Sequence, residues 1–239
     1  MPEEGRRTVH CGDALRWLEH NPLPQYCSLV TSLPDRSEFP ELTHQGWEDW
    51  FVEAASCLLR SCPEQGVVVF YQSDLRSPQG WTDKGFLCQQ AARRMGVPLL
   101  WHKIVCRVEP GCPSFGRPGY SHLLCFSPAL QLPLERSFAD VLPRAGRASW
   151  QRGMGLDVCR FVCRFLRRQT STRTIVAPFC GQGLLLAVAN AEGLDAIGIE
   201  RSPSRARRAG DLRLSELNSL EVGLKLREIG GEAHGRRPT

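Results

Sequence analysis

The sequence has no apolar run long enough to cross a membrane. None of its apolar stretches reaches the roughly 18 residues that a transmembrane helix needs. The N-terminal stretch MPEEGRRTVH lacks the apolar segment of a signal peptide, and its two acidic residues argue against a mitochondrial presequence. These absences lead us to expect no membrane partner and a cytoplasmic location, a nuclear one, or both.

Zinc-type cysteine spacing is also missing. The chain has 11 cysteines but no CxxC pair and no cysteine–histidine cluster at metal-ligand spacing. Most of them lie inside apolar runs, as Cys106, Cys125 and Cys163 do. Free cysteine is among the most often buried residues. We therefore expect reduced core cysteines and no metal site.

Neither of the two common phosphate-binding loops occurs in the chain. GxxxxGK[ST] is absent, and the GxGxxG pattern of dinucleotide sites is not met. The net charge of +5 is mildly basic. Such a charge is compatible with a polyanionic partner and equally with a solvated basic surface. Charge alone leaves both interpretations open.

Short apolar runs alternate with amphipathic stretches along the chain. This alternation predicts a Rossmann-like, doubly wound α/β sheet that is mostly parallel. One domain over residues 1–228 is expected, with a long surface loop at 130–153 and a disordered tail at 229–239. Strands are predicted at 7–12, 26–32, 66–74, 98–106, 121–129, 172–179 and 195–200. Helices are predicted at 13–21, 47–62, 83–96, 156–168, 184–193 and 204–228.

The most informative segment is 174–209. An apolar strand runs into the turn 179–183, which has the sequence FCGQG, and a helix follows at once. The next strand ends on Glu200. Glycines permit a tight turn and a close backbone approach, and an acidic residue at this strand end can accept hydrogen bonds from ribose hydroxyls. The pattern favours a cofactor with a ribose and without a phosphate.

This segment, APFCGQG…GIE, resembles the DPFCGSG…GIE signature of S-adenosylmethionine-dependent methyltransferases. The closest resemblance is to the permuted group that methylates exocyclic amines of nucleic-acid bases. HCGDALRWL is similar to that group's xxGDxLxxL, and SLVTSLPD to its DLIVTSPPY. The matches run in order over about residues 8–209. They imply a seven-stranded methyltransferase sheet with permuted motif order, a catalytic half (8–129), a cofactor-binding half (154–228) and S-adenosylmethionine as cofactor.

The resemblance also implies two sets of site residues. In the family, a polar residue and a backbone carbonyl of the catalytic turn accept hydrogen bonds from the target amine. That turn corresponds here to Ser32, Leu33, Pro34 and Asp35. The implied cofactor-binding residues are Asp13, Thr31, Phe179, Cys180, Gly181, Gly183 and Glu200. For Asp13, the N-cap of the following helix is an equally open interpretation.

Three positions depart from the family pattern. Leu33 replaces the first proline of SPPY, Asp35 replaces the aromatic residue that stacks on the target base, and Ala177 replaces the aspartate that organises the methionine end of the cofactor. Asp35 can be a hydrogen-bond acceptor, a general base, or a cap of the next loop. An inactive paralogue therefore stays open. Other aromatic residues that can serve as the stacking platform are Phe39, Trp47, Tyr71, Trp81, Trp101 and Tyr120.

Two arginine clusters are compatible with contacts to a phosphate backbone or with solvated helix faces. They lie at 160–168 and 201–208. Together with the resemblance they favour a methyltransferase acting on a base nitrogen of a structured RNA, such as a transfer, small nuclear or ribosomal RNA. RNA ranks above DNA because permuted DNA enzymes commonly carry a separate target-recognition region. A partner subunit, a catalytically inactive RNA-binding or scaffold protein, and a DNA or protein methyltransferase are the alternatives.

Overall fold

One large sheet forms the centre of the molecule. The computed structural model describes residues 5–77, 80–133, 138–150 and 153–215. Every pairing in the sheet is parallel except those of β7, which runs antiparallel to both of its neighbours. In spatial order the strands are β1 (Arg7–Cys11), β10 (Asp195–Glu200), β9 (Thr174–Pro178), β2 (Cys27–Thr31), β3 (Val68–Gln72), β7 (Tyr120–Phe126), β6 (Leu99–Cys106) and β8 (Val141–Leu142).

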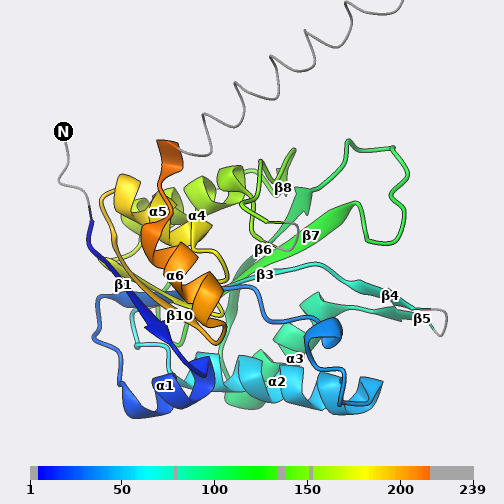
Figure 1. Cartoon of the computed structure of the whole chain (residues 1–239), viewed down its shortest axis with the longest axis horizontal. Coiled ribbons are helices and arrows are strands. Elements are labelled where there is room, and N and C mark those ends of the chain that lie inside the picture. The colour runs from blue at the N-terminus through cyan, green and yellow to red at the C-terminus, as the bar shows by residue number, and fades with distance from the viewer. Residues whose placement is uncertain (1–4, 78–79, 134–137, 151–152, 216–239) are drawn as a thin grey trace, which may run out of the picture.

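Helices cover both faces of this sheet, as the alternating pattern predicted (Figure 1). One face carries α1 (Ala14–His20), α2 (His44–Arg60) and α3 (Lys84–Met95). The opposite face carries α4 (Leu156–Gln169), α5 (Leu184–Ala191) and α6 (Pro203–Asp211). The doubly wound fold class is therefore confirmed.

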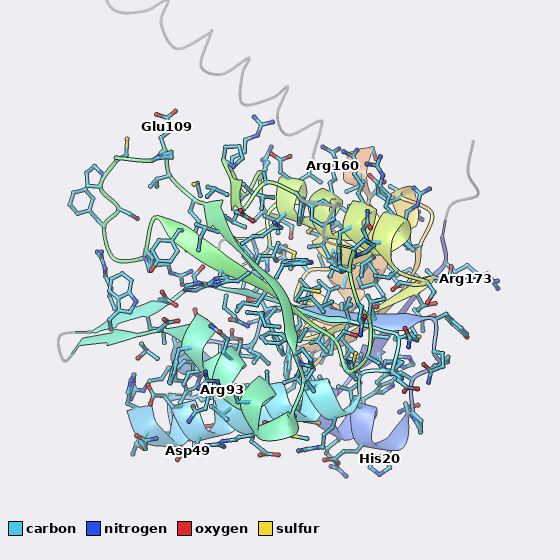
Figure 2. All side chains as sticks on the ribbon, turned by 180° about the vertical axis from the view of Figure 1, so that it is seen from behind. His20, Asp49, Arg93, Glu109, Arg160 and Arg173 are labelled. Atoms are coloured by element: carbon cyan, nitrogen blue, oxygen red, sulfur yellow. The ribbon has the colours of Figure 1, made fainter. Side chains whose placement is uncertain are left out.

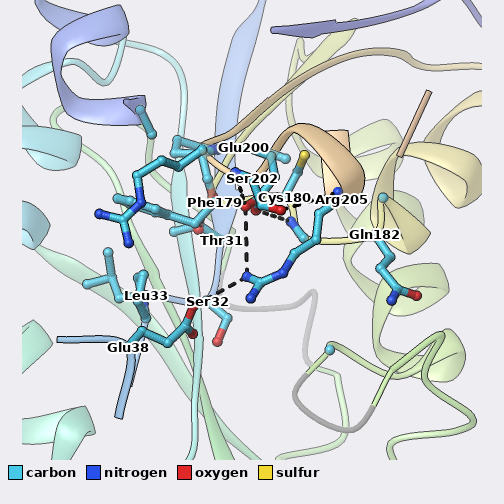
Figure 3. A pocket seen from close by; sticks show the side chains of 18 of the residues that line it. Thr31, Ser32, Leu33, Glu38, Phe179, Cys180, Gln182, Glu200, Ser202 and Arg205 are labelled. Atoms are coloured by element: carbon cyan, nitrogen blue, oxygen red, sulfur yellow. Dashed lines mark hydrogen bonds and ion pairs between the residues drawn. The ribbon is translucent and has the colours of Figure 1, made fainter. Parts of the chain in front are cut away.

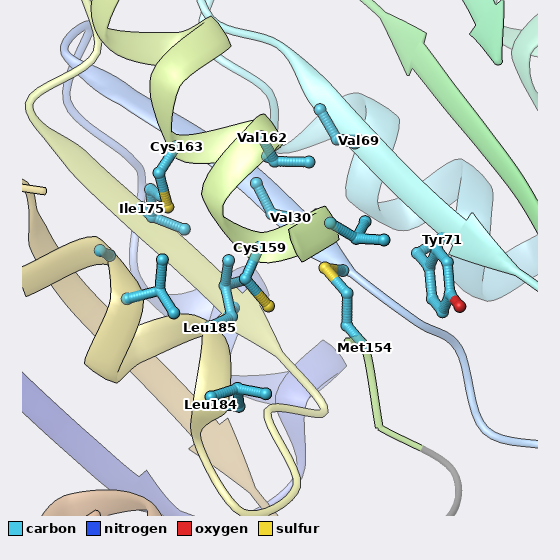
Figure 4. Close-up of a cluster of buried hydrophobic side chains, with 14 of the residues drawn as sticks. Val30, Val69, Tyr71, Met154, Cys159, Val162, Cys163, Ile175, Leu184 and Leu185 are labelled. Carbon is cyan, nitrogen blue, oxygen red and sulfur yellow. The ribbon is translucent and has the colours of Figure 1, made fainter. Parts of the chain in front are cut away.

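Each face has its own hydrophobic core. All residues of β2, β3 and β9 are buried, which explains why these strands read as continuous apolar runs rather than as alternating ones. On the face of α4 and α5, Cys159, Val162 and Leu185 pack near Val30 and Ile175 of the central strands (Figure 4). All 11 cysteines are free and eight are buried, which confirms the expected core role for most of them.

The structure also contains elements that the sequence patterns did not predict. An eighth strand, β8, lies within the predicted 130–153 loop, and its two residues extend the sheet beyond the expected seven strands. A separate hairpin is formed by β4 (Leu75–Ser77) and β5 (Gly80–Thr82). A 3-10 turn spans Arg36–Glu38.

Two expectations concern parts of the chain that the structure covers incompletely. The predicted helix at 204–228 is described only as far as residue 215, and in this part α6 ends at Asp211. The predicted tail at 229–239 lies outside the described residues. Across the described part of the chain, no helix is both long enough and apolar enough to span a bilayer.

The centre of the sheet has a topological switch point. From β9 the chain passes through α5 to β10 on one side, whereas from β2 it passes through α2 to β3 on the other side. Adjacent crossovers that leave in opposite directions open a crevice outside the carboxyl ends of the two strands, and ligands of open α/β sheets bind there. The fold therefore places a ligand site at the ends of β2 and β9.

Candidate active site

A cavity of about 260 Å³ occupies this crevice. Its walls come from the residues at and after the carboxyl ends of β1, β2, β9 and β10, so segments far apart in the sequence meet there (Figure 3). All seven predicted cofactor-binding residues line it. We call it the cofactor-side cavity.

A strained turn forms one wall of this cavity. Phe179, Gly181 and Gly183 all have positive φ angles, of 58°, 56° and 79°. For Phe179 this left-handed conformation costs on the order of 1–2 kcal/mol. At Gly183 a Cβ atom would lie 2.6 Å from the Cα atom of Ala209 in α6, so only glycine allows this close approach. The two glycines of the turn thus have the physical roles that their spacing suggested.

Glu200 holds the turn and the start of α6 in place. One carboxylate oxygen accepts a hydrogen bond from the backbone N–H of Gly181 at 3.0 Å, and the other accepts one from the backbone N–H of Ser202 at 2.9 Å. The residue is buried at the carboxyl end of β10. Each carboxylate oxygen has more than one acceptor position, so Glu200 retains capacity to accept hydrogen bonds from ribose hydroxyls.

Further residues line the cavity that motif reasoning missed. Arg205, on α6, lies 3.3 Å from the carboxylate of Glu38 and 3.8 Å from that of Glu200 (Figure 3). Its guanidinium also lies 5.0 Å from the ring centre of Trp150. Trp150 comes from the long loop before α4 and lies against the Gly181 turn. Arg205 belongs to the arginine cluster at 201–208, for which the sequence suggested phosphate contacts, whereas no pattern in the sequence marks Trp150.

The remaining predicted cofactor-side residues have structural partners as well. Asp13 is the N-cap of α1, because its carboxylate accepts hydrogen bonds from the backbone N–H groups of Leu15 and Arg16. The hydroxyl of buried Thr31 donates to the carbonyl of Pro178 and so joins β2 to β9. Burial raises the pKa of Cys180 to about 12, which argues against a nucleophilic thiolate there.

A second cavity, of about 210 Å³, lies beside the first at the ends of β2 and β3. Ser32 and Asp35 line both cavities and therefore stand at their junction. Besides Ala145, Gly146, Ala148, Gly153 and Gly155, the second cavity is lined by polar and charged side chains. These side chains are Tyr71, Ser73, Lys84, Arg107 and Arg117. We call it the target-side cavity.

The predicted catalytic turn is anchored from two helices. Leu33 is buried against the α2–α3 core, and the indole N–H of Trp47 donates to the carbonyl of Pro34 at 3.4 Å. The ammonium of Lys84, itself buried, donates to the carboxylate of Asp35 at 2.6 Å. Asp35 stands at the N-cap position of the 3-10 turn, but its side chain makes no capping hydrogen bond there and is paired with Lys84 instead.

The six aromatic residues considered as stacking platforms have different positions. Tyr71 lines the target-side cavity, and Phe39 packs on Trp50 in the cofactor-side cavity. Trp47 is completely buried, and Trp101 packs against Phe165 of α4. The other two, Trp81 and Tyr120, donate hydrogen bonds to Asp74. Within the cavities themselves, Tyr71 is the candidate on the target side.

A buried acid–histidine network supports the base of the hairpin and α3. Asp74 accepts hydrogen bonds from Trp81, from Tyr120 and from the backbone N–H of Lys84. It also lies 3.1 Å from Nε2 of His122, whose other ring nitrogen lies 2.9 Å from Nε2 of a second histidine, His102. Burial alone raises the pKa of Asp74, but its hydrogen bonds, first that with His122, lower it below the usual value. His102 and His122 are therefore held in place by partners inside the fold, as structural histidines are.

The arginine clusters at 160–168 and 201–208 are partly committed to ion pairs. Arg164 and Arg167 of α4 lie 3.2 and 3.6 Å from the carboxylate of Glu192. Arg205 bridges Glu38 and Glu200, as described above. These arginines hold elements of the fold together, and their contribution to nucleic-acid binding stays a prediction.

Comparison with protein-family models and with curated protein sequences gives no match. Solved structures do match. TTHA0409, a predicted DNA modification methylase from Thermus thermophilus solved with S-adenosyl-L-methionine, superposes with a TM-score of 0.66 at 21% identity, covering 85% of this chain and 92% of that one. PvuII DNA methyltransferase, which is cytosine-N4-specific, gives 0.68 at 17% identity and covers 89% of each chain.

A third match is the M1.HpyAVI–SAM complex, with a TM-score of 0.56 at 13% identity, covering 85% of this chain and 97% of that one. At these identities the likeness concerns the fold. The expected methyltransferase sheet, with its parallel strands, its antiparallel β7 and its helices on both faces, is therefore confirmed. The chain has the fold of the DNA methyltransferases that act on exocyclic base amines, of which the cytosine-N4-specific PvuII enzyme is an example.

Proposed function

We propose that this protein is an S-adenosylmethionine-dependent methyltransferase that acts on an exocyclic amine of a nucleic-acid base. The observation that carries the proposal is the junction of the two cavities at Ser32 and Asp35. On one side lie a glycine turn and a ribose-compatible carboxylate. On the other side lies a polar cavity large enough for a base. A group transfer needs both reactants to meet at such a junction.

The residues present fit the cofactor. Glu200 and Asp13 present carboxylates at the ends of β10 and β1, and the Gly181 turn allows close backbone approach. When bound, S-adenosylmethionine supplies an electrophilic methyl group on its sulfonium. Ala177, buried at the end of β9, offers no carboxylate for the methionine end, so another group must bind that end.

The chain's own contribution to the reaction is to prepare the amine. The lone pair of an exocyclic amine is delocalised into its ring, so acceptors that bind the amine N–H groups make the nitrogen a better nucleophile. The hydroxyl of Ser32 and a backbone carbonyl of the turn are placed to accept these hydrogen bonds. Glu200 and the Gly181 turn would hold the cofactor, whose sulfonium would supply the methyl group, and the nitrogen would release one proton to solvent as it becomes the methylated amine.

Asp35 has a different role from the aromatic residue of the family pattern. Its carboxylate is paired with the buried ammonium of Lys84, and Arg117 lies 3.7 Å away. A carboxylate held by two cations is a poor general base. It serves better as an anchor that holds the catalytic turn, while Tyr71, the aromatic residue that lines this cavity, is only 6% exposed.

DNA is the better supported nucleic acid. The preference for RNA rested on the absence of a separate target-recognition region. However, the match covers 92% of the Thermus protein and 89% of the PvuII enzyme, so these chains also carry little beyond the shared fold. Because both are described as DNA enzymes, we rank DNA first and a structured RNA second.

Calorimetric titration with S-adenosylmethionine tests the cofactor part of the proposal. We expect binding by the native chain. The Kd should rise at least about tenfold in Glu200→Ala, because charged hydrogen bonds contribute about 1.5–3 kcal/mol each. Gly181→Ala should weaken binding too, since a Cβ there would lie 3.2 Å from Trp150 with φ at 56°. Glu53→Ala, an exposed carboxylate on α2, is the matched control and should not change the Kd.

Methyl transfer is then measured with radiolabelled cofactor on mixed-sequence DNA and RNA. Ser32→Ala should abolish transfer and leave the Kd for the cofactor unchanged. Failure of a folded native chain to bind millimolar cofactor would overturn the enzymatic proposal and favour the inactive alternative. Binding without transfer to either nucleic acid would overturn the nucleic-acid part and direct attention to protein substrates.

A further inference from the structure

Two segments project from the same side of the molecule beside the target-side cavity. One is the β4–β5 hairpin, and the other is the loop over residues 107–119 between β6 and β7 (Figure 1). Neither belongs to the layers of the fold. Glu109 lies at the top of the loop when the molecule is seen from behind (Figure 2). We call these segments the two arms.

Each arm presents a large aromatic ring to solvent. Trp81, on β5, is 45% exposed, and Phe115, in the loop, is 90% exposed. Exposing such a ring has a cost in water. Single exposed aromatic residues are common on protein surfaces, but these two lie on neighbouring segments next to a cavity. Their position favours a function in binding.

Arg76 of β4 connects the two arms. Its guanidinium lies 4.8 Å from the ring centre of Trp81, and it donates a hydrogen bond to the carbonyl of Ser114 at 3.3 Å. Ser114 directly precedes Phe115. The arginine therefore orders the two aromatic segments relative to each other before any ligand binds.

Two more arginines continue this surface into the target-side cavity. Arg107 donates to the hydroxyl of Ser73 at 3.3 Å, and Arg117 lies 3.7 Å from the carboxylate of Asp35. Both line the cavity. A continuous path thus leads from the exposed rings of the arms, over three arginines, to the predicted catalytic turn.

The chemistry of this path selects its partner. Over 75–77, 80–82 and 107–119, the described residues of the arms, there are three arginines and one carboxylate, Glu109. An excess of cations favours a polyanion. Exposed rings beside arginines favour flat ligands with accessible π-faces, and such faces are available on unpaired bases but not inside a duplex. A protein partner would need a larger continuous apolar patch.

We propose that the two arms bind a single-stranded segment of nucleic acid and lead one nucleotide into the target-side cavity. Bases stack on Trp81 and Phe115, and Arg76, Arg107 and Arg117 contact phosphates. The proposal rests on the proposed function, because it assigns a substrate path to the same site. It also supplies the target-recognition region that the sequence did not reveal.

Fluorescence anisotropy with labelled strands of about 12 nucleotides tests the proposal. The probes are oligodeoxyuridylate, oligouridylate and a DNA duplex of the same length. We expect a single strand to bind more tightly than the duplex. Trp81→Ala and Phe115→Ala should each weaken binding by roughly fivefold or more. Arg76→Ala should lower the salt dependence of binding by about one phosphate contact. The stronger of the two single strands identifies the sugar preference.

Matched controls lie at the amino ends of the central strands β2 and β9, opposite the carboxyl ends where the cavities are. Tyr26, 48% exposed, precedes β2, and exposed Arg173 precedes β9. Arg173 is seen at the far side from the arms (Figure 2). Tyr26→Ala and Arg173→Ala should leave single-strand binding unchanged.

The proposal is overturned if the control variants weaken binding as much as the arm variants do, or if duplex binds as tightly as single strand. It is also overturned if the native chain binds neither strand. Cofactor titration of the same proteins separates this failure from failure of the proposed function. If the chain binds the cofactor but no strand, only the proposal about the arms is contradicted. If it binds neither cofactor nor strand, the proposed function is contradicted as well.

Discussion

The two cavities that meet at Ser32 are built in opposite ways. The cofactor-side cavity is shaped mainly by backbone, through the Phe179–Gly183 turn and the two N–H groups bound by Glu200. The target-side cavity is shaped mainly by long side chains, with Lys84, Arg107 and Arg117 around Asp35. The first agrees with the family pattern at most positions, and the second departs from it.

This difference teaches which part of the site can change. A backbone cradle tolerates few substitutions, because its geometry depends on positive φ angles and on close packing of α6. A cavity lined by side chains can exchange them and so acquire another substrate. We therefore interpret the ion-paired Asp35, where the family has an aromatic residue, as a change of target or target pose, and the methyl-transfer assay decides between this interpretation and an inactive paralogue. The predictions below test the two halves of this comparison.

The largest effect is expected at the Asp35–Lys84 pair. Asp35→Ala leaves the ammonium of Lys84 buried without its carboxylate partner. Breaking a buried ion pair in this way costs about 3–5 kcal/mol. Chemical denaturation should show a loss of this size in the free energy of unfolding. The double variant Asp35→Leu/Lys84→Met should recover much of this loss, because it removes both charges.

The matched control for this pair is the exposed one between Glu53 and Arg60, whose nitrogen and oxygen atoms lie 3.1 Å apart. Glu53→Ala should cost at most about 1 kcal/mol. If Asp35→Ala costs no more than Glu53→Ala, side chains do not hold the target side together, and the contrast between the two cavities fails.

The next effect concerns the backbone cradle. Gly183→Ala forces a left-handed alanine, which costs about 1–2 kcal/mol, and brings a Cβ to 2.6 Å from the backbone of Ala209. We expect lower stability together with weaker cofactor binding. Gly210→Ala, in α6, meets nothing within 4 Å and should be neutral or stabilise by up to about 1 kcal/mol. Equal stability of the two variants would contradict the close-packed cradle.

The same contrast explains what could be predicted from the sequence. The cradle was predictable because its signal is local: an apolar strand, two glycines, a helix and a strand ending on Glu200 lie within one short segment. The target side was not, because its contacts are long-range. Lys84 is 49 positions from Asp35, and Arg117 comes from a proline- and glycine-rich loop without periodicity.

Short elements were missed for a related reason. The strands of the β4–β5 hairpin have three residues each, and β8 has two, so none is long enough to show an alternating pattern. Trp150 and Arg205 joined the cofactor-side cavity through tertiary packing of a loop and of α6. For Asp13 the sequence left helix capping and cofactor binding equally open, and the structure shows the N-cap contacts at a residue that also lines the cofactor-side cavity.

The smallest effect is expected from a change of pH, which acts on the pair formed by His102 and His122. Burial, and then the charge of His122, lower the pKa of His102 below 6.5, while Asp83 and Asp74 oppose this shift. A lowered histidine pKa means that the unfolded chain binds the proton more tightly. The contribution of His102 to stability is therefore complete above pH 6.5 and is lost as the pH falls below that value.

Urea unfolding at about pH 7.5 and about pH 5.5 measures this loss. The native chain should be less stable at the lower pH, and His102→Asn should reduce the difference. A native chain that gains stability on acidification, with His102→Asn abolishing the gain, would contradict a neutral His102. It would instead indicate that the carboxylates of Asp74 and Asp83 hold the histidine pair in its charged form, so that these carboxylates outweigh the effect of burial.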